Sequence, residues 1–420
     1  MPSLTYRELL AGNRNFRNLL AGQVISELGN WFNFIAGLGL VRLVSDASPT
    51  AAGIFFVCRL LPFAFASPIA GTLVDRFSRR QVMIAMDLAR VVVALMYLLV
   101  SSPETLWVAY TATILLSTAG AFFEGAKNAA TPNLTGRDGL LAGTALMFSS
   151  RFLLMAVGSA LGGWAAAAFG YKVAFLINAV SFLVSAYTVW LIPEEATRDE
   201  LSADRMSGNA TRESFMTELR EGFNYTLTNR LALTILIMNV IWATGGGAIN
   251  VIFERGGGIY FAEKEHWNPD IAVAILWTAS GFGLTLGMLI AHRTSIYLDR
   301  KRINHAFIGG SLIIHGVVFS IAGLMPTLWL FAVFTFVSRV IVGVEYAVQE
   351  TMFQRSLPDF IRGRISTLDR GAEMTMFGLS SYFASEAMFY ISPITLTIVS
   401  GILSASSGVV WFLREKPERS

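Results

Sequence analysis

Residues 51–101 decide what kind of protein this is, and they read AAGIFFVCRLLPFAFASPIAGTLV, then DRFSRRQ, then VMIAMDLARVVVALMYLLVS. The first and third segments are almost continuously apolar, and a segment with three arginines separates them. A helix needs about 20 apolar residues to cross the hydrocarbon core of a bilayer. This stretch therefore predicts two transmembrane helices joined by a short loop at the membrane surface.

The same alternation of apolar and basic segments continues along the whole chain of 420 residues. Only 15% of the residues are charged, whereas soluble domains usually carry about 25%. The sequence thus predicts an all-α membrane protein with twelve transmembrane helices. These spans are expected at about residues 16–44, 51–74, 82–101, 106–126, 141–169, 173–192, 231–253, 271–292, 305–324, 328–348, 365–389 and 394–413.

Lysine and arginine residues alternate with these spans in a way that predicts the orientation. They concentrate before the first span, in the even-numbered loops and in the C-terminal tail, whereas the other side has little beyond Lys172, Arg255 and Lys264. Cytoplasmic loops of membrane proteins are enriched in lysine and arginine. We therefore expect a multi-pass membrane protein with both termini and the central loop in the cytoplasm.

A polar stretch after the sixth span divides the chain. We expect an N-terminal six-helix bundle at residues 1–192, a cytoplasmic linker at residues 193–228 and a C-terminal six-helix bundle at residues 229–420. Within the linker, apolar residues recur every four positions at Phe215, Leu219 and Phe223. This spacing predicts a short amphipathic helix, which either anchors the linker at the membrane or binds a partner.

Several classes of function are not expected from the composition. The net charge of +3 could suggest nucleic acid, but the basic residues lie at the ends of the spans, where topology requires them. Cys58 is the only cysteine, so neither an internal disulfide nor a thiolate metal site is possible. The four histidines show no ligand spacing. We expect no metal, no cofactor and no nucleic acid partner, and no cleavable signal at the N-terminus.

The loop between the second and third spans carries a recognisable motif, Gly71-Thr-Leu-Val-Asp75-Arg76-Phe-Ser-Arg79-Arg80. It resembles the G-x-L-x-D-R-x-G-R-R/K signature of the major facilitator superfamily, with serine in place of the second glycine. Glycine permits close approach of helices, the aspartate places a carboxylate at a helix end, and the arginines favour the anionic leaflet. We expect these residues to form a gate, with Asp75 approaching Lys127 or the start of the eleventh span.

Further segments resemble a bacterial efflux branch of this superfamily, which includes enterobactin-exporter-like and macrolide-efflux-like proteins. Asn30 replaces the usual aspartate of the first span, and Ser159 replaces the proline of the fifth. The resemblance also adds Glu124 to the gating residues, together with Asp87 and Arg90. The matching segments are Gly22–Trp31, Arg59–Pro62, Asp87–Arg90, Phe123–Lys127, Phe175–Phe182 and Gln354–Arg364.

Charged residues inside the spans cost several kcal/mol each on insertion scales, so each requires a reason. Glu27 and Arg59 lie at similar depths on antiparallel spans and could form a pair, and Asn30 shares the helix face of Glu27. Glu27 could carry the coupling proton, or it could simply neutralise Arg59 in every state. Arg151 and Arg339 also fall near mid-depth, and these five residues are the predicted coupling and cavity residues.

Other polar positions have alternative interpretations. Asp87 and Arg90 are three residues apart and could be a structural pair instead of part of a gate. His315 could be an ordinary hydrogen-bonded histidine of the bundle. Glu345 and Glu373 lie deep enough to need partners. The triplet Gly245–Gly247 could break the seventh span near a binding site, or it could allow close packing.

These observations predict a secondary active transporter, with no enzymatic activity, that works by alternating access between two bundles. The resemblance implies proton-coupled antiport and efflux of an amphipathic drug or siderophore, in the bacterial cytoplasmic (inner) membrane. The expected partners are a small-molecule substrate, the proton and the lipid bilayer, and we expect a monomer. A lysophospholipid or lipid translocator on the same fold is the first alternative, and a non-transporting membrane sensor is the second. A membrane enzyme would need a nucleophile with its base or a metal cluster, and neither pattern is present in the sequence.

Overall fold

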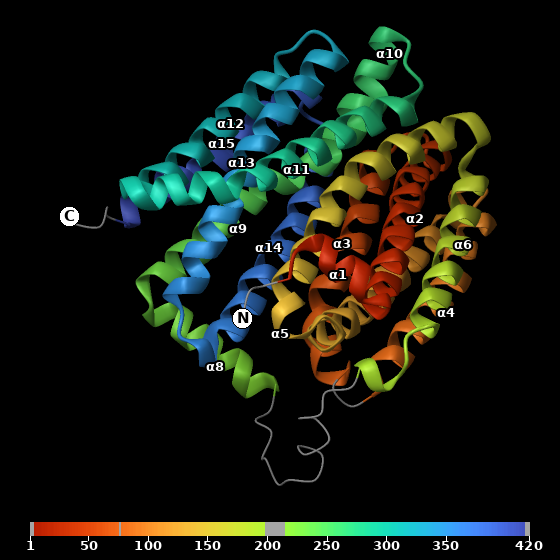
Figure 1. Ribbon diagram of the computed structural model, residues 1–420. Helices are drawn as coiled ribbons and strands as arrows, with labels where there is room; N and C mark the ends of the chain where they lie inside the picture. Colours follow the sequence, from red (N-terminus) through yellow and green to blue (C-terminus); the bar gives the residue numbers. More distant parts are fainter. Residues whose placement is uncertain (1–3, 75–76, 198–214, 416–420) are drawn as a thin grey trace. The chain divides into compact units, whose positions relative to one another are not determined.

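The computed structural model of the protein describes residues 4–74, 77–197 and 215–415, and its regular elements there are all helical (Figure 1). The chain forms two compact units. The first comprises Met1–Asp46 and Pro62–Glu213, and the second comprises Ala47–Leu61 and Ser214–Ser420. The predicted class, an all-α chain of membrane-spanning helices, is confirmed.

The first unit is built from long helices linked by short turns. Its helix α2 packs against α5 and α6, and α4 packs against the same two helices. Phe16, Met83 and Phe123 come from α2, α4 and α5 and are buried in one apolar core. The helices are α1 (Tyr6–Gly12), α2 (Arg14–Val44), the second part of α3 (Pro49–Val74), α4 (Arg79–Met96), η1 (Tyr97–Leu99), η2 (Pro103–Thr105), α5 (Leu106–Phe169), α6 (Tyr171–Trp190) and η3 (Glu195–Thr197).

Helix α5 contains two predicted spans and turns sharply between them at Gly136. The backbone of Gly136 has φ +65° and ψ 175°, a combination that is essentially restricted to glycine. The short helix α1 lies against this turn, where Asn13 at its C-cap donates from Nδ2 to the Leu134 carbonyl at 2.5 Å. The expected loop between spans four and five is therefore mostly helical, and one glycine reverses the direction of the chain.

Helix α3 is shared between the two units. Residues 47–61 are grouped with the second unit, where the Thr50 hydroxyl donates to the Glu386 carboxylate at 2.7 Å and Ser385 donates to the Pro49 carbonyl. The grouping changes at Pro62, which lies inside the helix. A proline in a helix interior removes one backbone hydrogen bond and bends the helix. The sequence predicts that the whole second span lies in the N-terminal bundle. The division into two six-helix bundles stays a prediction.

The second unit consists mainly of long helices in close contact. Helix α9 packs against α14 and α15, α11 packs against α13, and α12 packs against α13 and α15. Its largest buried side chain is Trp411. The helices are the first part of α3, α8 (Phe215–Thr228), α9 (Arg230–Ile252), the π-helix η4 (Phe253–Phe261), α10 (Ala262–Glu265), α11 (Pro269–Lys301), α12 (Asn304–Gly323), α13 (Leu328–Ser356), α14 (Asp359–Ala387) and α15 (Pro393–Arg414).

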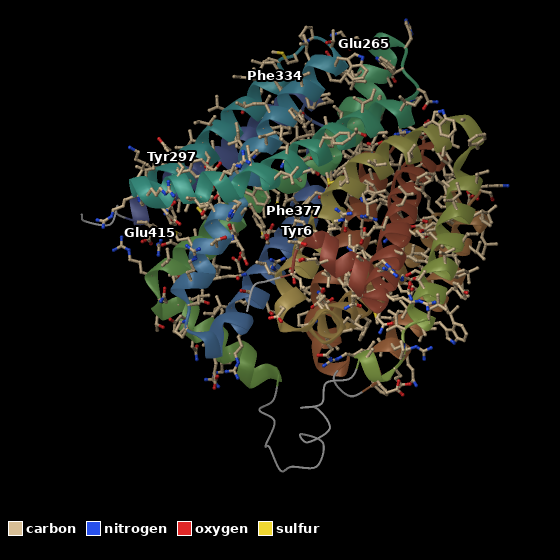
Figure 2. All side chains as sticks on the ribbon, in the orientation of Figure 1. Tyr6, Glu265, Tyr297, Phe334, Phe377 and Glu415 are labelled. Carbon is tan, nitrogen blue, oxygen red and sulfur yellow. The ribbon has the colours of Figure 1, made fainter. Side chains whose placement is uncertain are left out.

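The glycine triplet of the seventh span serves close packing. Helix α9 continues through Gly245–Gly247 to Ile252, so the alternative of a break at the triplet is wrong. A Cβ atom added to Gly247 would lie 2.5 Å from the Phe377 carbonyl oxygen, and one added to Gly246 would lie 3.0 Å from the Phe377 ring. Phe377 belongs to α14 and is labelled in Figure 2. The small residues thus bring α9 and α14 into contact.

Eleven helices of the described residues are long and apolar enough to cross a membrane. Helix α14, which corresponds to the eleventh of the twelve predicted spans, has 29 residues but is too polar to qualify. Its first half contains Asp369, Arg370 and Glu373. Helices α11 and α13 also extend to Lys301 and Ser356, eight or nine residues past their expected ends, because hydropathy marks only the part of a helix that lies in hydrocarbon.

Candidate functional site: buried charges inside the helical units

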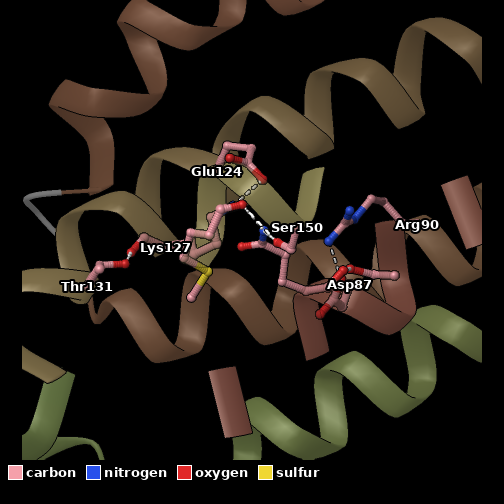
Figure 3. Close-up of polar contacts among 9 residues, drawn as sticks. Asp87, Arg90, Glu124, Lys127, Thr131 and Ser150 are labelled. Carbon is pink, nitrogen blue, oxygen red and sulfur yellow. Dashed lines mark hydrogen bonds and ion pairs between the residues drawn. The ribbon is translucent and has the colours of Figure 1, made fainter. Parts of the chain in front are cut away.

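A buried ion pair lies at the centre of the first unit. Asp87 and Arg90 are one turn apart on α4 and contact each other, and their side chains are 0% and 5% exposed (Figure 3). The Arg90 guanidinium also lies over the rings of Phe123 and Phe182, 4.4 and 4.3 Å from their centroids. A carboxylate and two aromatic faces thus surround a cation that would otherwise be costly in this environment. The expected pairing of Asp87 with Arg90 is confirmed.

A second charged group lies on α5. Lys127 Nζ donates to the Glu124 carboxylate at 2.7 Å, and Lys127 is only 4% exposed. Helix α5 turns back at Gly136, and the positive charge of Arg151 beyond the turn also acts on Glu124. Nearby, Gln23 of α2 donates to Ser150 at 3.2 Å. Figure 3 shows Glu124, Lys127 and Ser150 beside the Asp87–Arg90 pair.

The arginines of the loop motif fasten the start of α4. Arg79 Nη1 donates to the Ala129 carbonyl at 3.0 Å, and Arg80 Nη2 donates to the Trp190 carbonyl at 2.7 Å. These bonds hold α4 against α5 and against the end of α6. Asp75 and Arg76 lie outside the described residues, and Gly71 is described in its backbone only. The approach of Asp75 to Lys127 therefore stays a prediction.

Two of the predicted polar residues of the second unit lie together between α12 and α13. His315 Nδ1 and Ser338 Oγ share a hydrogen bond of 2.6 Å, so His315 is a hydrogen-bonded histidine of the bundle. Arg339 is 6% exposed and its guanidinium lies 5.6 Å from the Phe319 ring centroid. Its Nε and Nη2 atoms are buried without a hydrogen-bond partner among the described residues.

A polar network joins three helices of the same unit. Gln349 of α13 donates to the Asn239 side chain of α9 at 3.0 Å, and Asn239 donates to Asp369 of α14 at 2.9 Å. The other oxygen of Asp369, Oδ1, is buried and has no hydrogen-bond partner among the described residues. Beside the network, Arg370 Nη2 lies 3.7 Å from a carboxylate oxygen of Glu350.

The remaining predicted cavity residues are partly accessible. Glu27 and Asn30 are half-buried on α2, Arg59 is half-buried on α3, and Arg151 is exposed. Glu27 belongs to the first unit, whereas Arg59 lies in the part of α3 that is grouped with the second. Their pairing stays a prediction.

These buried charged and polar groups are better suited to ion movement and conformational change than to covalent catalysis. Ionisable side chains inside membrane-spanning segments mark ion or substrate pathways or proton relays. In the first unit, Asp87 pairs with Arg90, and Glu124 pairs with Lys127. In both units, some carboxylate and guanidinium atoms, such as Asp87 Oδ2, Arg90 Nε and Asp369 Oδ1, are buried without a hydrogen-bond partner among the described residues.

The sequence model of the family described as Major Facilitator Superfamily matches residues 19–368, which is most of the chain. The chain belongs to the major facilitator superfamily. The resemblance seen in the loop motif is thereby confirmed, and so is the fold. Members of this superfamily are transporters and not enzymes, so the protein is a multi-pass membrane transporter.

Relatives within the superfamily include proteins named for efflux. Macrolide efflux protein A of Streptococcus pyogenes is 23% identical over 405 residues, which cover 95% of this chain and 91% of that protein. The uncharacterized MFS-type transporter YfiS of Bacillus subtilis is 27% identical over 231 residues. That match covers 55% of this chain, and it spans about half (54%) of YfiS.

The fold is shared with solved structures of transporters at lower sequence identity. The nucleoside transporter NupG superposes with a TM-score of 0.72 at 13% sequence identity, and the match covers 96% of this chain and all (100%) of that one. At this identity the likeness shows the fold alone.

Sequence reasoning missed Asn239, Gln349 and the role of Asp369 as their partner. A single amide in an otherwise apolar span does not reveal its partner, and this pairing joins residues more than a hundred positions apart. One signal was available: Asp369 and Glu373 are four residues apart inside a predicted span, a spacing that puts two acids on one helix face.

Proposed function

We propose that this protein is a secondary exporter that expels an amphipathic organic compound from the cell by alternating access, in exchange for protons. The observation that carries the proposal is the similarity to a macrolide efflux protein over nearly the full length of both chains. Polar and charged side chains inside the helical units support it, since a transporter needs them along its pathway. A drug or a siderophore is the substrate class that we propose.

For coupling, we propose that Glu27 takes up and releases a proton during the cycle, with Asn30, Arg59, Arg151 and Arg339 lining the cavity. Glu27 is half-buried, so its carboxyl group combines partial accessibility with an apolar setting. The gate would consist of Gly71, Asp75, Arg76, Arg79, Arg80, Asp87, Arg90, Glu124 and Lys127.

For location, we propose the bacterial cytoplasmic membrane, with both termini and the linker on the cytoplasmic side and the protein working as a monomer. The basic residues of the even-numbered loops support this orientation. The extended helix ends fit the same picture, since α11 ends in Arg300 and Lys301.

The purified protein provides a direct test. Macrolides, siderophores and amphipathic drugs would first be screened for thermal stabilisation, because a ligand that binds the folded state raises its stability. Compounds that stabilise would then be loaded into proteoliposomes with an imposed pH gradient. We expect flux of at least one compound that responds to the gradient. Lysophospholipid flux without flux of any such compound would favour the lipid translocator, and no flux of either kind would contradict export.

A further inference from the structure

An acidic and aromatic face of α14 points to a binding site that the sequence did not predict. Asp369, Glu373 and Phe377 follow one another at intervals of four residues and so share one face of this helix. The face packs on α9. Asn239 bonds Asp369 at 2.9 Å, and Trp242 meets Phe377 edge to face with 5.3 Å between ring centroids.

Glu373 lies between these two contacts, one helical turn from each. It is only 6% exposed, and among the described residues no hydrogen bond or ion pair joins another group to its carboxyl group. The nearby Oδ1 atom of Asp369 is buried without a hydrogen-bond partner among the described residues. A carboxylate removed from water without a partner costs several kcal/mol. The two acids therefore require a positive charge or a proton that the described side chains supply only in part.

The charged and titratable groups that act on Glu373 come from α13 and from α14 itself. Asp369 and Arg370 on α14, and Glu350 on α13, interact with it electrostatically, and so does Tyr346 of α13. Arg370 is the one cation of this set, and it lies 3.7 Å from a carboxylate oxygen of Glu350. The set thus contains three carboxyl groups and one guanidinium.

The other helices that pack on α14 complete the surroundings. Helix α9 contributes the uncharged Asn239 and Trp242. Helix α8 contributes Glu221, which is paired with Arg364, and the first part of α3 contributes Arg59 as its charged residue. The excess of negative charge around Glu373 therefore belongs to α13 and α14.

We propose that Asp369 and Glu373, with the Trp242–Phe377 pair, bind the cationic group of an amphipathic organic substrate and hold a proton in its place when the substrate leaves. Carboxylates attract a positive charge, and aromatic faces stabilise organic cations at close range. The combination favours an organic cation whose charge is attached to an apolar body. The exchange balances charge, because one cation enters the acidic pair for each proton released. The proposal rests on the proposed export function and names its substrate class.

The test uses tetraphenylphosphonium, a lipophilic organic cation, with the full-length protein in detergent. Equilibrium dialysis measures its binding from alkaline to acid pH, and an indicator dye in weakly buffered solution measures proton release. We expect binding to weaken as the pH falls and to release protons. Glu373→Gln should weaken binding at least about tenfold and abolish much of the release, as expected when a charged contact is lost.

Three further variants separate a binding role from a structural one. Glu373→Asp should restore part of the binding, because it keeps the charge. Trp242→Leu should weaken binding but retain the proton release per bound cation. Asp299→Asn is the control, since it removes a surface carboxylate that lies 3.5 Å from Arg355 in the same unit, and it should change neither quantity. Thermal unfolding of each variant confirms that it is folded.

Unchanged binding and proton release in Glu373→Gln would overturn the inference. The inference would also be wrong if the wild-type protein bound no tetraphenylphosphonium but transported neutral or anionic compounds. In that case the proposed export function would still be supported. Conversely, cation binding with the expected variant effects, but no flux of any compound in proteoliposomes, would support this site and contradict the proposed export.

Discussion

Arg90 shows how a single charge is accommodated inside a membrane-spanning unit. Its guanidinium contacts the Asp87 carboxylate and lies between the rings of Phe123 and Phe182. Removing one member of a buried ion pair leaves the other charge uncompensated, whereas replacing both with apolar residues is often neutral. We therefore expect the intact Asp87–Arg90 pair to be more stable than a variant that lacks one partner, but not more stable than a variant in which both are apolar.

The first prediction tests this asymmetry. Asp87→Ala should lower the free energy of unfolding by about 3–5 kcal/mol, because Arg90 would remain buried and unpaired. The double variant Asp87→Leu with Arg90→Met should recover most of the loss. Thermal unfolding in detergent gives both values in one double-mutant cycle. A double variant as unstable as the single one would show that the pair is not the source of the effect.

The second prediction concerns Glu27, the coupling residue proposed from the sequence. Glu27→Gln cannot release a proton, so uphill transport driven by a pH gradient should be lost while substrate exchange and folding are retained. Proteoliposome flux with and without the gradient distinguishes these activities. The proposal fails if the variant concentrates substrate with the normal pH dependence, and Glu27 would then be structural. Comparison with Glu373→Gln shows which unit carries the coupling proton.

At the scale of elements, the turn inside α5 places Glu124, Lys127 and Arg151 near one another. Gly136 makes this turn possible with a positive φ of 65°. Nothing lies within 4 Å of a Cβ atom built on Gly136. The requirement for glycine at this position is therefore conformational, not steric.

The third prediction follows from that distinction. Gly136→Ala should destabilise the protein by about 1–3 kcal/mol, because alanine is strained in this backbone region. Gly120→Ala is a matched control on the same helix: it also has open space around its Cβ position, but it has an ordinary helical φ. It should be neutral or stabilising by up to about 1 kcal/mol. Equal thermal stability of the two variants would rule out strain at Gly136.

Hydropathy predicted the positions of the spans well, but it did not predict the helical segments that are polar or rich in glycine. The seventh span was expected to end near residue 253, but the helical path continues as the π-helix Phe253–Phe261 and α10 to Glu265. Segments with Gly256–Gly258 and buried Glu254 are not recognisable as helix by apolar content. Helix α14 was recognised as a span, although its acids make it too polar for a span by composition. Its packing on α9 and α8 provides the contacts that composition does not.

For the whole molecule, the distribution of lysine and arginine leads to the fourth prediction. A reporter that is active only in the cytoplasm should be active when it is fused after Ser420, and so should one inserted in the central linker, because both segments are rich in basic residues. A reporter that is active only outside the cytoplasm should be active when it is inserted between α10 and α11, and a reporter that is active only in the cytoplasm should be inactive there. If a reporter that is active only outside the cytoplasm were active when fused after Ser420, the proposed topology would be wrong, and so would the proposed direction of transport.

The sequence by itself determined that this is a multi-pass membrane transporter of the major facilitator superfamily. Span length and charge placement are local properties, and the loop motif from Gly71 to Arg80 is contiguous, so no three-dimensional information was needed. Which polar groups meet was decided only by the tertiary structure. Asn239, Gln349 and Asp369 lie on three helices far apart in the chain, and they form one network. The physical reason is that a buried polar atom takes whichever partner the packing of helices brings within about 3 Å, and no local pattern specifies that partner.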